Sequence, residues 1–274
     1  MTPLVDALRG LPLPRRLRRT WAPGLAVRAA WAWEADDRAD PRWWPQGVAA
    51  PGDGLLLVAW YAKDGGARVS VADTRAGRYA HVPLAGEDGA PLHVHAGGLA
   101  ADGPWLHVAA TRAGFVSLHA DDLPAAPAEP WRVRRASGPL EVADGPALRV
   151  SFLAPAGGGL VVGEYARGEA PRRLAHVPLD DGVPTGPARV LGEGPAGMQG
   201  AVLALGAGEP GAGVLSTSHG PWVPGTLWTG SPGAWRARRW ALPMGPEDLA
   251  RDPDGRLWCA TEHPHRRWLV RVAG

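Results

Sequence analysis

Five short phrases recur along the chain at intervals of about fifty residues. They are PQGVA at Pro45, HAGGLA at His95, RVSFLA at Arg149, MQGAV at Met198 and PEDLA at Pro246. From Gln46 onward, the polar residues of successive phrases lie 49, 56, 48 and 48 residues apart. Repeats of this length are typical of proteins in which each repeat packs against its neighbours. The spacing therefore predicts one domain built from repeats.

Each phrase is followed by a turn and by further strand-like runs. In the first unit these runs are LLLVAWY, ARVSVAD and RYAHVPL, and the 38 glycines and 29 prolines of the chain punctuate all units in the same way. Four strands per repeat of this size are typical of a β-propeller blade. We expect a single all-β domain of five four-stranded antiparallel blades, at about residues 43–90, 91–140, 141–194, 195–243 and 244–274. The alternative is a six-bladed propeller in which residues 1–42 contribute more than one strand.

The last unit has three strand-like runs, the third of which is RWLVRVA, and a fourth is not found after it. A segment with strand character, LAVRAAWAWEA, precedes the first unit at residues 25–35. We therefore expect residues 20–42 to form a closing strand and linker, with residues 25–35 paired to residues 267–272. This pairing would complete the last blade and close the ring.

Charge and cysteine content exclude several classes of function. The net charge is only +2, and the arginines are scattered apart from PRRLRR at residues 14–19, so we expect no nucleic-acid partner. Cys259 is the only cysteine, which excludes an intrachain disulfide. No run approaches the ~18 apolar residues of a membrane span, and we expect no membrane partner. The N-terminal charges follow the apolar stretch, which is the reverse of a secretory signal, so we expect a cytoplasmic protein, or a secreted one if a longer precursor exists. Separately, we expect a monomer.

A propeller brings polar residues of distant segments to one mouth of its central channel. The first strand of each blade lines the channel and the second runs back beside it, so the start of one and the end of the other lie on the same face. We expect Gly47 and Gly200 to allow close packing at this axis. Polar or aromatic residues at these positions predict a site for a small molecule. They are Gln46, His95, Ser151, Gln199 and Glu247 from first strands, and Trp60, Tyr61, Thr111, Glu164, Tyr165, His219, Glu262 and His263 from second strands.

The residue types favour acid–base chemistry. We expect burial to raise the pKa of Glu247 and Glu164, which would make them the acid and base, with His95 or His219 as proton partner. The other members of the set would bind and orient the substrate. The predicted function is an enzyme without a redox cofactor that cyclises, isomerises or hydrolyses a natural-product intermediate. The alternatives are a non-catalytic ligand- or carbohydrate-binding propeller and a protein-interaction scaffold.

The opening phrases resemble those of the calcium-dependent lactonase and strictosidine-synthase-like propellers, whose blades open with PEG, PNG or PDG. PQG at Pro45 and PED at Pro246 match that style, and the full set of phrases is similar to uncharacterised actinobacterial propellers. The resemblance to lactonases implies six blades and a divalent cation held by axial acids and asparagines. Because Glu247 is the one acid among the five matching first-strand positions, we expect no tightly held cation here.

Overall fold

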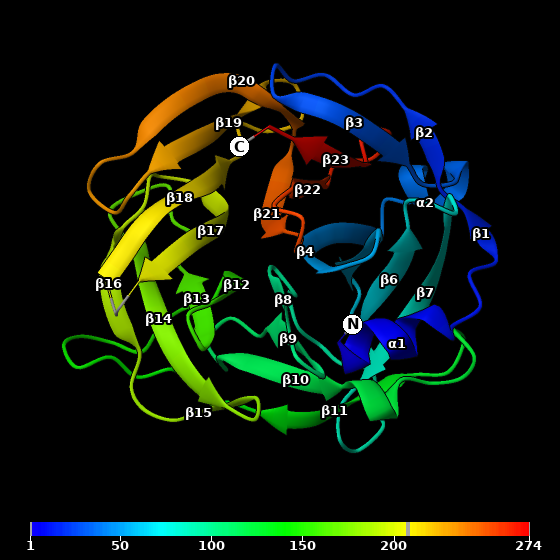
Figure 1. Ribbon diagram of the computed structural model, residues 1–274, viewed down its shortest axis with the longest axis horizontal. Coiled ribbons are helices and arrows are strands. Elements are labelled where there is room, and N and C mark those ends of the chain that lie inside the picture. Colours follow the sequence, from blue (N-terminus) through cyan, green and yellow to red (C-terminus); the bar gives the residue numbers. More distant parts are fainter. Residues whose placement is uncertain (1, 207–208, 274) are drawn as a thin grey trace.

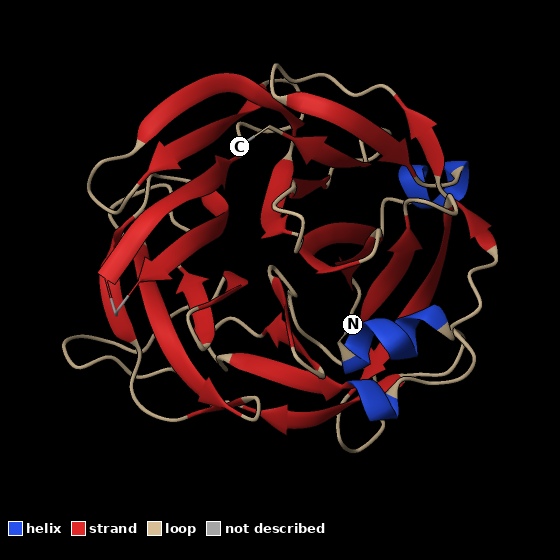
Figure 2. Cartoon of the chain, in the orientation of Figure 1, coloured by secondary structure: helices blue, strands red, loops and turns tan. Residues whose placement is uncertain are grey.

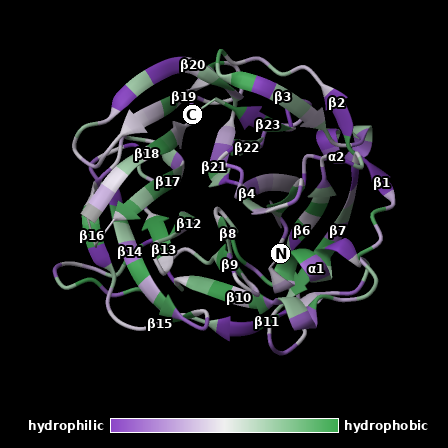
Figure 3. Ribbon diagram, viewed as in Figure 1, coloured by the Kyte–Doolittle hydropathy of each residue, from purple (hydrophilic) through white to green (hydrophobic). Residues whose placement is uncertain are grey.

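Short strands arranged around one axis form most of the molecule (Figure 1). The computed structural model describes residues 2–206 and 209–273. Tight turns with positive φ connect the strands, as at Asp53 (φ 58°) and Gly54 (φ 81°), which suit a two-residue hairpin loop. Hydropathy varies from strand to strand (Figure 3): residues 55–60 are buried throughout, whereas buried and exposed residues alternate over residues 131–134. The expectation of an all-β, propeller-like fold is confirmed.

The strands form five antiparallel runs that follow the five phrases. The first two runs are β4 (Trp43–Gly52), β5 (Leu55–Ala62), β6 (Ala67–Asp73) and β7 (Arg78–Ala85), then β8 (Leu99–Asp102), β9 (Trp105–Ala109), β10 (Phe115–His119) and β11 (Trp131–Ala136). The third contains β12 (Phe152–Ala156), β13 (Gly159–Gly163), β14 (Arg173–Asp180), β15 (Val183–Pro184) and β16 (Arg189–Glu193). The fourth contains β17 (Met198–Gly206), β18 (Glu209–Thr217), β19 (Pro224–Gly230) and β20 (Arg236–Met244). The last contains β21 (Pro246–Arg251), β22 (Leu257–Thr261), β23 (Trp268–Val272), β3 (Val27–Ala32) and β2 (Arg18–Thr20).

The first two runs belong to one hydrogen-bonded sheet. Their outer strands, β7 and β11, pair in parallel where Trp131 faces Leu84 and Arg132 faces Ala85. Counted by backbone hydrogen bonds, the described residues therefore form four sheets of nine, five, four and five strands. The sequence did not indicate this contact, because nothing in a strand's pattern reveals pairing between the outer strands of two units.

The N-terminal segment closes the ring. β3 pairs with β23 in antiparallel fashion, with Trp31 facing Leu269, so the pairing expected between residues 25–35 and 267–272 is present. The segment also contributes more than expected: β2 adds an outermost strand to the same sheet, and β1 (Arg15–Arg16) pairs with β7. Leu17 lies between these two short strands and is buried. Residues 15–20 therefore cover the outer edges of both the first and the last run.

Two short α-helices and one 3-10 turn lie outside the sheets (Figure 2). They are α1 (Pro3–Arg9), α2 (Ala35–Ala39) and η1 (Ala120–Asp122). The Thr2 hydroxyl accepts a hydrogen bond from the Val5 N–H at 3.4 Å and caps α1. The apolar face of α1 packs into the core between the first and second runs. In the described part of the chain, no helix has the length and apolar character needed to cross a membrane.

Neighbouring runs pack face to face through buried apolar side chains. One cluster joins the last run to the first and includes Trp31, Trp60 and Trp258. Others join the second run to the third around Phe115, and the third to the fourth around Met198. Most of the burial therefore occurs between runs, which explains why the chain needs all of them to form a core.

The first strands approach one another closely at the axis. A Cβ added to Gly47 would lie 2.6 Å from the Gly98 carbonyl carbon, and one added to Gly200 would lie 2.5 Å from the Asp248 Cα. Side chains do not fit at these distances, so the expected role of Gly47 and Gly200 in close packing is confirmed. The Asp248 carboxyl group crosses the same region and accepts hydrogen bonds from the N–H groups of Val48 and Leu99, each at 3.1 Å.

We predict that Trp31→Ala lowers the free energy of unfolding by about 3–5 kcal/mol, because it removes a buried aromatic side chain from the closing strand. Trp21→Ala is the matched control, since Trp21 belongs to the same N-terminal segment but is 78% exposed. Its effect should stay within about 0.5 kcal/mol. Urea-induced unfolding followed by circular dichroism measures both. Equal effects of the two substitutions would contradict the closing role of β3.

Candidate active site

A central cavity of about 440 Å³ collects polar residues from all five runs. Eight of the residues expected at the channel mouth line it: Gln46, His95, Thr111, Ser151, Tyr165, Gln199, Glu247 and Glu262. Gly97 and Arg149 complete the lining. Most of the residues expected at the starts of first strands and the ends of second strands therefore line the same cavity.

Glu247 is an almost fully buried carboxyl group in β21. Burial raises its pKa well above the ordinary value of 4.5, and the neighbouring Glu262 raises it further through charge repulsion and a side-chain hydrogen bond. The Gln199 amide opposes this by donating to Glu247 Oε1 at 2.8 Å. The raised pKa favours the protonated form of Glu247, which then donates towards Glu262.

Glu262 directly follows β22 and is the less buried partner. Burial raises its pKa as well, but hydrogen bonds from Gln46 and Glu247 and the positive charge of Arg267 act against the increase. The Gln46 Nε2 donates to Glu262 Oε2 at 3.3 Å. A single row of hydrogen bonds thus runs from Gln199 through Glu247 and Glu262 to Gln46. Of the two acids, Glu262 is the one that ionises first.

Arg267 holds the backbone behind this acid pair. Its guanidinium is fully buried, and its Nε donates to the Glu262 carbonyl oxygen at 2.9 Å. Its Nη1 donates to the carbonyl oxygens of Asp37 and Asp40 in and after α2, at 2.7 and 2.8 Å. Burial lowers the pKa of Arg267 to about 10, which still leaves it cationic at neutral pH. The residue therefore fixes Glu262 to α2 and supplies positive charge beneath it.

Tyr61 packs against His95, which lines the cavity. Their ring centroids are 4.4 Å apart. Burial of the imidazole lowers the pKa of His95, although the residue as a whole reaches solvent. Burial and the two glutamates raise the pKa of Tyr61. Both rings are therefore neutral at neutral pH, and they present hydrogen-bonding groups without adding charge to the cavity.

The donor set does not fit a calcium ion. Calcium prefers several oxygen ligands that carry compensating negative charge. The two cavity acids instead share a hydrogen bond, and burial favours their neutral forms. The third axial acid, Asp248, directs its carboxyl group to three backbone N–H groups, those of Val48, Leu99 and Leu249. Within residues 2–206 and 209–273, no group of three His, Cys, Asp or Glu side chains is arranged to hold a metal ion.

Glu164 is not the acid or base that the sequence suggested. It is buried, but it forms a two-point ion pair with Arg173, with Nε–Oε2 and Nη2–Oε1 distances of 2.7 and 2.8 Å. Burial alone would raise its pKa, yet this pair and the N–H of Arg149 lower it. The expected rise is therefore wrong, because the sequence pattern did not show that Arg173 would reach the carboxylate. Glu164 also lies outside the residues that line the central cavity.

Trp60, Tyr61 and His263 also lie outside the cavity lining. Successive residues of a strand point to opposite sides, so Trp60 is fully buried in the core while Tyr61 packs on the other side against His95. The Trp60 Nε1 donates to Ser70 Oγ at 2.7 Å. His263 follows the end of β22 and packs against Gly245, and its Nε2 lies 3.5 Å from Glu262 Oε1, so it flanks the acid pair without lining the cavity. The expected substrate contact of Trp60 is therefore corrected to a packing role.

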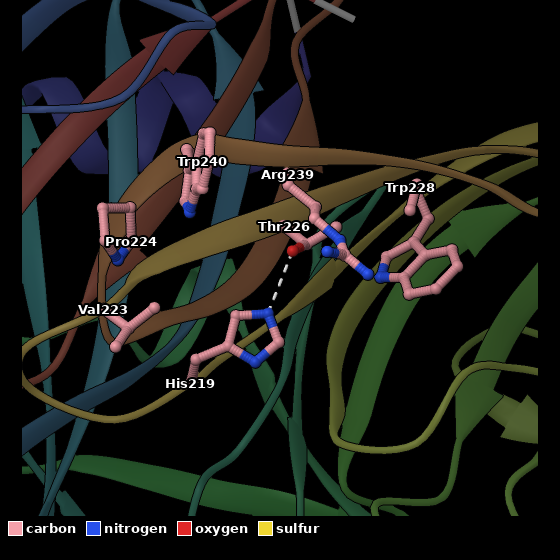
Figure 4. Close-up of a pocket in the computed structure, with 8 residues that line it drawn as sticks. His219, Val223, Pro224, Thr226, Trp228, Arg239 and Trp240 are labelled. Carbon is pink, nitrogen blue, oxygen red and sulfur yellow. Dashed lines mark hydrogen bonds between the residues drawn. The ribbon is translucent and has the colours of Figure 1, made fainter.

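His219 lies in a separate surface groove on the outer strands of the fourth run (Figure 4). It is two residues beyond the end of β18, and its Nε2 is 2.9 Å from the Thr226 hydroxyl of β19. The loop turns this side chain towards β19, away from the axis. His219 is therefore not a proton partner for the acid pair.

Arg149 is the lining residue that the sequence reasoning missed. It lies two positions before Ser151, so strand alternation alone would have placed both on one side. Its Nη2 donates to the carbonyl oxygens of Tyr165 and Pro171 at 3.3 and 3.4 Å. Within the described residues, its guanidinium has no carboxylate within 4.0 Å, although its backbone N–H donates to Glu164 Oε1 at 3.0 Å.

Comparison with known proteins gives one partial family match. The profile described as "Strictosidine synthase-like, N-terminal" matches residues 236–263, which include Glu247 and Glu262. No curated protein sequence matches the chain. The chain is similar in structure to hydrazine synthase of Kuenenia stuttgartiensis, at 16% identity and a TM-score of 0.43, over 79% of this chain and 61% of that one. This chain therefore spans less than two thirds of the hydrazine synthase chain.

Two further solved structures have slightly higher TM-scores. A protein of unknown function from Bacteroides thetaiotaomicron is 11% identical, with a TM-score of 0.47 over 86% of this chain and 71% of that one. A glucose dehydrogenase is 14% identical, with a TM-score of 0.47 over 97% of both chains.

We predict that Glu247→Gln and Glu164→Gln change the pH dependence of stability in opposite directions. The raised pKa of Glu247 means that the wild type loses stability as pH rises above 4.5, so the uncharged variant should become relatively more stable with rising pH. The lowered pKa of Glu164 contributes stability above 4.5 that is lost as pH falls through the folded-state value. Glu164→Gln should therefore cost on the order of 3 kcal/mol at neutral pH and much less in acid.

Urea unfolding of both variants and the wild type, repeated from acid to neutral pH, measures these differences. If the free-energy difference from the wild type changed in the same direction with rising pH for both variants, the assigned protonation states would be contradicted.

Proposed function

We propose that the protein is an enzyme that acts on one small molecule in the central cavity by acid–base chemistry. The observation that carries this proposal is the hydrogen-bonded pair of Glu247 and Glu262 in a lining that is otherwise polar. Two acids at one buried position disfavour each other's charge, so one keeps its proton while the other ionises. Such a pair holds a proton donor and a proton acceptor side by side.

In this proposal Glu247 is the general acid and Glu262 the general base. The Gln199 amide donates to Glu247 and the Gln46 amide donates to Glu262. These hydrogen bonds fix the orientation of the two carboxyl groups. Arg267 keeps Glu262 in place through its backbone carbonyl. Proton transfer between a substrate and this pair is sufficient for cyclisation, isomerisation or hydrolysis, and none of these reactions needs a redox cofactor.

The family match supports an enzymatic role. It covers all of β20, β21 and β22 and both acids, and the family is named for a synthase. The natural-product class of substrate remains part of the proposal. We also propose that the five antiparallel runs are five blades, because each run starts at one of the five phrases and both β1 and β2 add only to existing edges.

We predict that Glu247→Gln and Glu262→Gln each reduce turnover by about 10²–10⁴-fold, the usual contribution of a general acid or base. Glu164→Gln should retain turnover once its lower stability is allowed for. A panel of small lactones and esters, followed by proton release with an indicator dye, is the first set of probes. Wild-type rates in both cavity variants would disprove the assignment.

The pH profile and the stoichiometry give two further checks. Loss of the Glu247 proton should set the alkaline limb of the profile, and Glu247→Gln should remove that limb from any residual activity.

A compound that is turned over should saturate at one molecule per chain. Saturation near five per chain would favour the non-catalytic binding module, which would use equivalent sites between blades.

A further inference from the structure

Four large apolar side chains lie exposed on one part of the surface, and we call them the tryptophan patch. They are Leu25, Trp222, Val223 and Trp240, with exposed fractions of 64, 75, 45 and 59%. The Leu25 N–H donates to the Trp240 carbonyl oxygen at 2.8 Å, and Trp240 and Val223 line the same groove (Figure 4). Exposed apolar groups that gather in this way mark an interaction surface.

The backbone holds Trp240 outward. Between the pairs Gly225–Leu242 and Leu227–Arg238, strand β20 has more residues than β19, which makes a bulge at Trp240. Trp240 has φ of +57°, a conformation that bulky residues rarely adopt. Such backbone strain is maintained where a side chain must be presented in a particular direction. Here it directs an indole towards solvent.

Positive charge lies around the patch. Residues 14–33 and 210–246, which supply the whole patch, contain eight arginines and no aspartate or glutamate, although Arg15 forms ion pairs with Glu34, Asp36 and Asp37 outside these ranges. Arg239 lines the groove, and the Arg266 guanidinium lies 4.0 Å from the centroid of Trp222. The structure gives neither arginine an ion pair among the residues it describes. The surface is therefore complementary to negative charge.

The patch lies on the same side of the molecule as the cavity mouth. Trp222 and Val223 belong to the loop that follows β18, and Arg266 belongs to the loop that follows β22 and also carries Glu262. The two loops touch, because the Gly220 backbone hydrogen-bonds to His263 and Arg266 covers Trp222. A partner on this patch would therefore sit beside the entrance to the central cavity.

We propose that the tryptophan patch docks the protein on a lipid surface that carries anionic headgroups. Indole rings prefer the interface between headgroups and acyl chains, and basic side chains next to them pair with anionic lipids. Leu25 and Val223 have no aromatic face on which nucleic-acid bases could stack, which disfavours single-stranded nucleic acid as the occupant. A symmetric dimer through the patch would bring the same arginines against each other. The proposal does not depend on the chemistry of the cavity.

Vesicle flotation of the full chain tests this surface. We expect strong binding to vesicles in which one lipid in three is phosphatidylserine, weak binding to pure phosphatidylcholine, and less binding in high salt. The double variant Trp222→Ser/Trp240→Ser should reduce the partition coefficient at least about tenfold, since affinity follows the apolar area that enters the interface. Arg238→Ser/Arg239→Ser should reduce it by about fivefold per arginine on anionic vesicles only.

Matched controls use exposed residues elsewhere on the surface. Val183→Ser/Val190→Ser removes two exposed apolar side chains from the third run, and Arg112→Ser/Arg132→Ser removes two exposed arginines from the second. Both should bind vesicles as the wild type does. Thermal unfolding confirms that each variant is folded. Quenching of wild-type tryptophan fluorescence by brominated phosphatidylcholine in the anionic vesicles needs no variant at all and should be clearly measurable.

Several results would overturn the proposal. Equal wild-type binding to anionic and neutral vesicles, no quenching by brominated lipid, or unchanged binding of the tryptophan variant would each do so. A dimer in sedimentation velocity that the tryptophan variant abolishes, without vesicle binding, would assign the patch to a second copy of the chain. Patch-dependent binding of oligothymidylate without vesicle binding would assign it to nucleic acid.

Discussion

The closeness of the first strands at the axis is the constraint on which the rest of the structure depends. A Cβ on Gly98 would lie 2.2 Å from the Leu153 nitrogen, so the backbones themselves are in contact there. The Asp248 carboxyl group accepts N–H groups from its own strand and from β4 and β8, and so joins three first strands at one point. Because these strands are packed so closely, the polar residues next to the axial glycines Gly47 and Gly200 point into the central cavity. These residues are Gln46 and Gln199.

The acid pair differs from two other buried carboxyl groups, which have cationic partners, and from Asp248, whose raised pKa is opposed by three backbone N–H groups. Asp37 is paired with Arg68 and His81, and Glu164 with Arg173, and in both cases these partners lower the pKa of the acid. Glu247 has no cationic partner and faces a second acid instead. Burying a carboxyl group beside a like group costs folding stability, whereas an arginine partner offsets that cost. An arrangement that opposes stability in this way is typical of functional positions, where a perturbed pKa is required.

The sequence predicted those features that follow from strand geometry and missed those that depend on how far a side chain reaches. The spacing of the phrases placed Gln46, Gln199 and Glu247 around one axis, and the pairing of β3 with β23 followed from the strand missing in the last unit. The pattern did not show that Arg173 reaches Glu164 or that the loop after β18 turns His219 outward. Contacts of long side chains and loop directions are tertiary properties, and a strand's alternation contains no information about them.

Ring closure and the acid pair form one structural unit. Arg267 immediately precedes β23, the strand that β3 covers, and its guanidinium connects the Glu262 carbonyl oxygen to the carbonyl oxygens of Asp37 and Asp40. It is fully buried near the rings of Trp44 and Trp60, at 5.8 and 5.6 Å from their centroids. A buried cation held only by carbonyl groups and rings tolerates little displacement, since each lost contact exposes an unpaired charge to the apolar core. The N-terminal segment therefore helps to hold the Glu262 backbone in its position beside Glu247.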